Sequence, residues 1–192
     1  VWDQVEAAGQ ILRPGAICHV GGEVGEYQGR KDLKIVRFRT AAAGDPGFDP
    51  ADFVERPTFD TEKTYRELLD FLRSLLVRPH LRQLLDCFDE RHGAVFSRHY
   101  GAQKVHHAYL GGLLKHTDAL VRLAAVVAEY YGLDREILCL GAFLHDIGKT
   151  VEFTIEPAPD LSPSGGLLGH IMLGCQMVQE MKATIPDFPE AD

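Results

Sequence analysis

The sequence predicts a mainly α fold in which a helical domain follows a partial β region. Short apolar alternation, typical of strands, occupies the first part of the chain, and apolar residues at helical spacing fill the rest. Between them lies a segment rich in Ala, Gly, Asp and Pro, which indicates a linker. We therefore expect a β domain over residues 1–42, a linker over 43–58 and a helical domain over 59–192.

Composition limits the possible classes of protein. Among the 192 residues, 45% are hydrophobic and 25% are charged, which is ordinary for a globular domain. No apolar run approaches the roughly 20 residues that span a bilayer, so we expect no membrane partner. The four cysteines form no CxxC pair; Cys139 and Cys175 lie in apolar helical runs, where we expect buried thiols. With no signal peptide at the start of the chain, these features predict a cytoplasmic protein.

The β region carries a local concentration of positive charge, although the net charge of the chain is −8. Residues 16–20, 23–27 and 33–39 have strand patterns, with a turn over 28–31. In an oligonucleotide-binding barrel (OB-fold), basic side chains on the strands bind phosphates and aromatic rings stack on bases. A solvated hairpin face is the alternative. The candidate nucleic-acid-binding residues are Tyr27, Arg30, Lys31 and Lys34.

The helical region begins with apolar residues that follow a cap at Thr61, and Pro79 should end this first helix. A second helix is expected from about Leu81 to Phe88. Further along, Gly132 and Asp134 should end one helix and cap the next.

A candidate metal site follows in the same region. Residues 156–169, rich in Pro and Gly, should form a loop, after which His170 opens the last helix. His145 and Asp146 end an apolar helix and offer adjacent nitrogen and oxygen ligands, and His116 lies in the preceding helix. Any one of these histidines could be a core residue, but three from successive helices favour a shared metal. A divalent cation there would activate water and neutralise phosphoryl oxygens.

Lys149 lies one turn after Asp146 and could contact the same phosphate, or it could be a cation at a helix C-terminus. On a continuous helix His106 would lie about 80° from His116 and His107 about 180°, so His106 is the better placed to reach the metal side. Either histidine could bind substrate phosphate or simply pack. Asp118 should point away from His116 as a surface charge.

These residues resemble a known family. His116 followed by His145-Asp146 is similar to the HD superfamily of metal-dependent phosphohydrolases. Together with residues 106–117 and Gly169-His170-Ile171, they look most like the YhaM-type 3′-to-5′ exoribonucleases. The resemblance implies an OB-fold followed by a helical HD domain, and hydrolysis of single-stranded RNA, or alternatively DNA, from the 3′ end.

The resemblance also implies a divalent cation, manganese above all, with Mg²⁺, Fe²⁺ or Co²⁺ as alternatives and one or two ions bound. By this likeness Asp146 and Lys149 are the catalytic residues, and His116, His145, Asp146 and His170 are the metal ligands. The family pattern continues with a late aspartate that Asp187 and Asp192 come too early to supply. We therefore expect a fragment of a longer protein, and a homo-oligomer is possible.

Two other functions stay open. The chain could be an HD phosphohydrolase that acts on a nucleotide or cyclic dinucleotide. It could also be a non-catalytic protein that binds single-stranded nucleic acid, with a structural metal.

Overall fold

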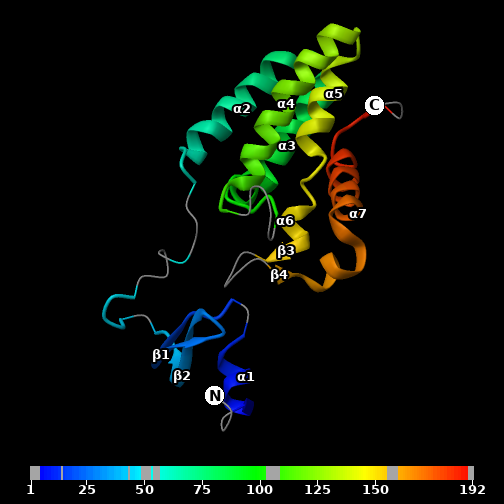
Figure 1. Cartoon of the computed structure of the whole chain (residues 1–192). Helices are drawn as coiled ribbons and strands as arrows, with labels where there is room; N and C mark the ends of the chain where they lie inside the picture. Colours follow the sequence, from blue (N-terminus) through cyan, green and yellow to red (C-terminus); the bar gives the residue numbers. More distant parts are fainter. Residues whose placement is uncertain are drawn as a thin grey trace. The chain divides into compact units, whose positions relative to one another are not determined.

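The computed structural model describes residues 5–13, 15–42, 44–48, 53, 57–102, 109–154 and 160–189. The chain divides into two compact units (Figure 1). One comprises residues 1–54 with 156–158, and the other comprises 55–155 with 159–192. The first holds a two-stranded hairpin and the second is mostly helical, so the predicted fold class is confirmed. The OB-fold and the domain bounds 1–42, 43–58 and 59–192 stay predictions.

The first unit contains helix α1 (Val5–Ile11) and strands β1 (Cys18–Tyr27) and β2 (Arg30–Thr40), which pair antiparallel. The strands are joined by Gln28-Gly29, both with positive φ (52° and 76°), as a type I′ hairpin turn requires. The register shifts between Gly21 and Gly22, which marks a β-bulge. The stretch expected as two short strands is therefore one long strand.

The register of the hairpin separates the basic residues onto two faces. Glu23 pairs with Lys34 and Tyr27 pairs with Arg30, and side chains two residues apart along a strand share a face. Arg30 and Lys34 therefore lie on the face of Tyr27, whereas Lys31 lies on the opposite face. All four side chains are exposed.

Helices α2 (Thr61–Leu75) and α3 (Pro79–Phe96) open the second unit. Asp60, one residue before the predicted cap, accepts a hydrogen bond from the Lys63 amide at 2.9 Å. Pro79 separates the helices as predicted and occupies the first turn of α3, where a proline costs no hydrogen bond. The predicted end at Phe88 is wrong, because the buried face of α3 continues to Phe96.

Helices α4 (Gly112–Tyr131) and α5 (Arg135–Leu144) pack against each other in the middle of this unit. Gly132 ends α4 in the left-handed conformation (φ 64°), as predicted. The Asp134 carboxylate caps α5 by accepting two backbone N–H groups, also as predicted. The sequence thus defines both ends of the connection between α4 and α5.

The last part of the unit comprises helix α6 (Lys149–Glu152), the two-residue strands β3 (Phe153–Thr154) and β4 (Asp160–Leu161), and helix α7 (Pro163–Lys182). Residues 163–168, expected as loop, are helical because Ser162 caps them and Pro163 is favoured in a first turn. Gly169 (φ 71°) then interrupts α7, so His170 begins its second segment.

The core of the helical unit fixes the turn after α5. Phe88, Phe96 and Phe143 are fully buried and form a cluster, with the rings of Phe88 and Phe143 5.0 Å apart at 83°. Ile147, one turn after Phe143, is also fully buried. Between these two anchors, the intervening His145-Asp146 pair is held in one orientation.

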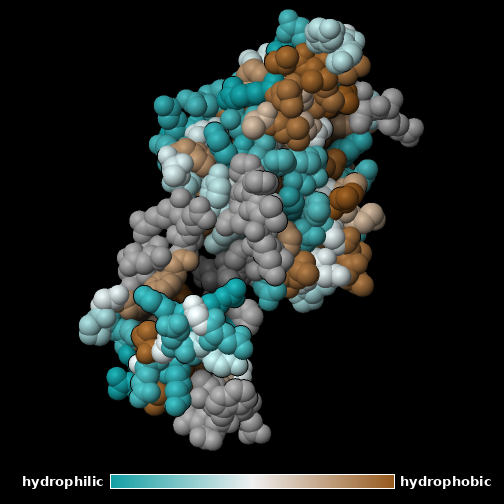
Figure 2. Space-filling model, in the orientation of Figure 1, coloured by the Kyte–Doolittle hydropathy of each residue, from teal (hydrophilic) through white to brown (hydrophobic). Residues whose placement is uncertain are grey.

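Large apolar side chains are exposed on several of the described helices, α4, α5 and α7 among them. Figure 2 shows apolar side chains gathered over the end of the helical unit where α4 leads into α5, with Leu123, Val126, Leu133 and Ile137 exposed. Among the described helices, none is both long enough and apolar enough to cross a membrane. Cys139 is buried as expected, but Cys175 is exposed, because it lies on the outer face of α7.

Two glycines bring α7 against the turn that carries His145-Asp146. A Cβ on Gly148 would overlap the His170 carbonyl oxygen and would lie 2.5 Å from the Gly174 nitrogen. A Cβ on Gly174 would meet the Gly148 nitrogen at 3.4 Å. The backbones touch here, so neither element can shift without moving His170.

We predict that Gly148→Ala lowers the free energy of unfolding by about 1–3 kcal/mol, because the added methyl group has no space. Urea unfolding of the wild type and the variant measures this difference. Gly141→Ala in the exposed part of α5, where a Cβ would have no neighbour within 4 Å, is the matched control. It should raise stability by about 0.4–1 kcal/mol, and equal effects of the two substitutions would contradict the close contact.

Candidate metal centre

Three elements of the helical unit bring the candidate ligands together. His116 lies in the second turn of α4, next to the buried Leu113 and Thr117. His145 and Asp146 form the turn that follows α5, and His170 opens the second segment of α7. These positions are far apart in the chain, and helix packing makes them neighbours.

The ligand atoms of His116, His145 and Asp146 lie within 4.8 Å of one another. The Nε2 atoms of the two histidines are 3.3 Å apart, and they lie 3.7 and 3.2 Å from the same oxygen, Asp146 Oδ2. Two imidazole nitrogens and a carboxylate oxygen form a donor set that suits Zn²⁺, Mn²⁺ or Fe²⁺. The residues present therefore fit a divalent cation.

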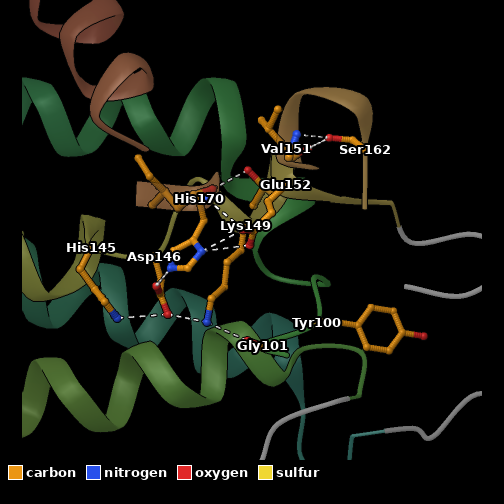
Figure 3. A network of polar contacts seen from close by, with 12 residues as sticks. Tyr100, Gly101, His145, Asp146, Lys149, Val151, Glu152, Ser162 and His170 are labelled. Atoms are coloured by element: carbon orange, nitrogen blue, oxygen red, sulfur yellow. Dashed lines mark hydrogen bonds and ion pairs between the residues drawn. The ribbon is translucent and has the colours of Figure 1, made fainter. Parts of the chain in front are cut away.

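Lys149 contacts the same carboxylate from the start of α6. Its ammonium nitrogen lies 2.8 Å from Asp146 Oδ2 and donates to the Gly101 carbonyl oxygen at 2.8 Å (Figure 3). These two acceptors use two of its three N–H donors within the described part of the chain. The positive charge is thus held at the edge of the centre, where a third N–H can meet an anionic ligand.

His170 approaches Asp146 from the side of the other oxygen. Its Nε2 atom lies 3.5 Å from Asp146 Oδ1, while its Nδ1 atom faces the carboxylate of Glu152 (Figure 3). Among the described residues, the compact ligand group consists of His116, His145 and Asp146, and His170 is not part of it. His170 therefore lies beside the three-residue group, and its role as a ligand stays a prediction.

Electrostatics at the centre are dominated by the Asp146 carboxylate, which is 7% exposed. Burial raises the pKa of Asp146, but hydrogen bonds from His145 and Lys149 and their positive charges outweigh it and hold the pKa well below its usual range. The hydrogen bond to Asp146 in turn raises the pKa of His145, against the opposing effect of burial. Without a metal, the Asp146 carboxylate and the Lys149 ammonium group thus stabilise each other, and the same carboxylate favours the protonated form of His145.

The other predicted site residues are either outside the described residues or part of the hairpin unit, apart from Asp118. His106 and His107 fall outside the described residues, and their roles stay predictions. Tyr27, Arg30, Lys31 and Lys34 belong to the hairpin unit. The prediction that Asp118 is a surface charge is wrong: the residue is 9% exposed, and Arg122 Nε, one turn later on α4, donates to its carboxylate at 2.8 Å. These two residues form an i,i+4 ion pair.

Sequence reasoning missed two groups that support the centre. Glu152 is buried, and its carboxylate is hydrogen-bonded to His170. In the sequence, the one feature that could have indicated its role is that it follows Lys149 by three residues and Asp146 by six. His99 is fully buried, and its ring nitrogens lie 3.2 and 3.3 Å from the carbonyl oxygens of Tyr100 and Phe153. Nothing local in the sequence indicates the contact with Phe153, since that residue lies far along the chain and only tertiary packing brings it to His99.

The raised pKa of His145 gives a testable pH dependence. In protein kept metal-free with chelator, the His145 imidazole should titrate above 6.5. Its stabilising contribution is present below about pH 6.5 and is lost as the pH rises through the raised value. In Asp146→Asn the pKa of His145 should fall, because the carboxylate that raises it is gone and the charge of Lys149, which lowers it, remains.

The measurement is an NMR titration of the histidine Cε1 protons. His92, whose pKa is lowered by burial away from this centre, is the internal control and should titrate alike in both proteins. A His145 curve that does not move in Asp146→Asn would contradict the coupling between the two residues.

Comparison with known proteins agrees with this geometry. Residues 113–187 match the family model described as the HD domain. The curated protein "3′-5′ exoribonuclease YhaM" of Listeria monocytogenes (serotype 4b, strain CLIP80459) is 28% identical over 182 residues, which is 94% of this chain and 58% of that protein. The protein of the same name from Bacillus subtilis (strain 168) is also 28% identical and is covered to 56%.

A third relative with this name, from Geobacillus sp. (strain WCH70), is 28% identical over 89% of this chain and 52% of its own length. The chain thus spans little more than half the length of these relatives. No solved structure matches it significantly. Residues 113–187, the part that holds His116, His145, Asp146 and His170, are thus similar to the HD domain, and over nearly its whole length the chain is similar to the YhaM-type exoribonucleases.

Proposed function

We propose that the intact protein is a metal-dependent phosphodiesterase that removes nucleotides from the 3′ end of single-stranded RNA. The observation that carries this proposal is the convergence of His116, His145 and Asp146 within 4.8 Å, with the Lys149 ammonium group beside them. Two nitrogens, a carboxylate oxygen and a nearby cation suit the hydrolysis of a phosphate ester. The 3′-to-5′ direction and RNA as substrate come from the printed names of the relatives.

His116, His145 and Asp146 would hold the metal. The cation supplies Lewis acidity, which polarises a phosphate ester and makes water a stronger nucleophile near neutral pH. The lowered pKa of Asp146 favours the anionic form of this side chain, which is the form that binds a cation. His145 Nδ1, bonded to the Ala142 carbonyl oxygen at 2.8 Å, leaves Nε2 directed at the centre.

Lys149 supplies the second part of the mechanism. Its ammonium group, oriented by Asp146 and by the Gly101 carbonyl oxygen, can donate a hydrogen bond to a non-bridging phosphate oxygen. Negative charge on these oxygens is neutralised most effectively by a cation that is already in place. Lys149 is therefore proposed as a catalytic residue through contact with the reacting phosphate.

The hairpin unit would bind the strand. Arg30 lies opposite Tyr27 and Lys34 lies four residues further along the same face of the hairpin, so phosphates can pair with the cations while a base stacks on the ring. Lys31, on the other face, would contact the backbone at the edge of this site. The same proposal includes four further points. The hairpin would be part of an OB-fold, DNA would be a second substrate, the metal would be manganese, and the protein would be cytoplasmic.

The nuclease proposal predicts that Asp146→Ala abolishes RNA degradation. The intact protein is incubated with RNA labelled at the 3′ or the 5′ end, with Mn²⁺ or with chelator. The wild type should release labelled mononucleotide at once from the 3′ label and shorten the 5′-labelled RNA stepwise. Substitution of a residue that only supports a metal ligand lowers the rate by up to about a hundredfold. Loss of a ligand itself should lower the rate of RNA degradation by more than this.

Asp70→Ala, at an exposed position on α2, is the control and should keep the wild-type rate. Retained activity in Asp146→Ala would reject the site assignment. If the wild type leaves RNA intact but binds it, the chain is a binding protein. If RNA stays intact and unbound, the proposal is rejected and nucleotides or cyclic dinucleotides become the substrates to test.

The role of the hairpin predicts a change in salt dependence. Replacing Arg30 and Lys34 by alanine should weaken RNA binding and reduce the slope of log K against log salt by about 1.4, since each phosphate contact on a single strand contributes about 0.7. Fluorescence anisotropy in chelator, over a series of salt concentrations, measures the slope.

A matched control removes the same charge from the helical unit. Lys63 and Arg66 are exposed on α2, and their double alanine variant should leave the slope unchanged. Equal slopes in all three proteins would mean that the hairpin does not bind the strand.

A further inference from the structure

Glu152 is a buried acidic residue next to the metal centre that neither the sequence pattern nor the proposed chemistry uses. It is 8% exposed and ends the short helix α6. A carboxylate in such a place is costly unless hydrogen-bond donors surround it. Its partners therefore indicate what it is for.

Both partners of the carboxylate belong to His170. Oε1 accepts the backbone N–H of His170 at 3.0 Å and lies 3.1 Å from its Nδ1 atom, and Oε2 lies 3.0 Å from Nδ1 (Figure 3). Gly169 interrupts α7, so the His170 N–H lies in the first turn of a helical segment and needs an acceptor. Glu152 thus caps this segment and binds the histidine ring at the same time.

The main chain of Glu152 is held as firmly as its side chain. Its N–H donates to the Gly148 carbonyl oxygen and its own carbonyl oxygen accepts from the Ser162 amide, both at 2.9 Å. Gly165 packs so closely that a Cβ there would overlap the Glu152 backbone. The carboxylate is therefore fixed before any ligand arrives.

We propose that Glu152 is a positioning residue that sets the orientation and the tautomer of His170. A carboxylate can only accept a hydrogen bond, and Glu152 lies 3.0 Å from Nδ1, closer than Asp146 lies to Nε2, so the neutral ring carries its proton on Nδ1 and keeps the lone pair on Nε2. That atom faces the centre, 3.5 Å from Asp146 Oδ1. Glu152 thereby makes His170 a nitrogen donor available to a cation at the centre, as outer carboxylates do for metal-binding histidines.

Glu152→Gln tests the tautomer with little change in shape. The amide oxygen can still accept the His170 N–H, but the amide nitrogen must donate to Nδ1, which moves the ring proton to Nε2. Long-range ¹H–¹⁵N NMR of the metal-free intact protein above neutral pH should find Nδ1 protonated in the wild type and Nε2 protonated in the variant. Mn²⁺ affinity, from the EPR signal of free Mn²⁺, should fall about ten- to a hundredfold.

His170→Ala should lose the same affinity, and the double variant should lose no more than either single one, because both changes remove one nitrogen donor. Glu136→Gln is the matched control. The Glu136 carboxylate also accepts two backbone N–H groups, from Val77 and Arg78 at 2.6 and 2.8 Å, but at the opposite end of α5 from His145. This variant should leave Mn²⁺ affinity unchanged.

A wild-type His170 ring protonated at Nε2 alone would overturn the inference, and this result needs no variant to fold. Unchanged Mn²⁺ affinity in a folded Glu152→Gln protein would also overturn it. The inference rests on the proposed function only in that the centre binds a metal. The protein could fail to degrade RNA while Glu152→Gln still changes the His170 tautomer and the Mn²⁺ affinity. That result would reject the nuclease proposal and support the role of Glu152.

Discussion

The buried carboxylate of Asp146 is the group on which the arrangement of this centre depends. Its Oδ2 atom lies within 3.7 Å of His116, His145 and Lys149, and Oδ1 faces His170. A single negative charge, 7% exposed, thus organises four basic side chains from four segments. Each of these side chains also has a second interaction or a helix to support it, so the cluster is preorganised.

The helical core leaves the turn after α5 little freedom. Phe143 and Ile147 anchor it from one side, and the contact between the Gly148 and Gly174 backbones closes it from the other. The His145-Asp146 pair lies between these restraints. The buried side chains of Phe143 and Ile147 and the lack of a side chain at the two glycines therefore act together to position His145 and Asp146.

Much of this could be predicted from the sequence where the signal is local. The caps at Gly132 and Asp134 and the adjacency of His145-Asp146 follow from residue type and spacing. The continuation of α3 to Phe96, the helical start of α7 and the burial of Asp118 could not, because tertiary packing or a single cap decides them. Glu152 shows the same limit, since its partner is 18 residues away along the chain.

The Gly148–Gly174 contact has a consequence for how this protein would respond to mutation. Neither glycine has a functional group, yet their closeness determines where α7 lies and, with it, His170. In a deep mutational scan scored by activity alone, Gly148 would rank among the ligands, although it does no chemistry. Abundance measured in the same library would separate the two classes, because a ligand variant accumulates as folded protein and a glycine variant does not.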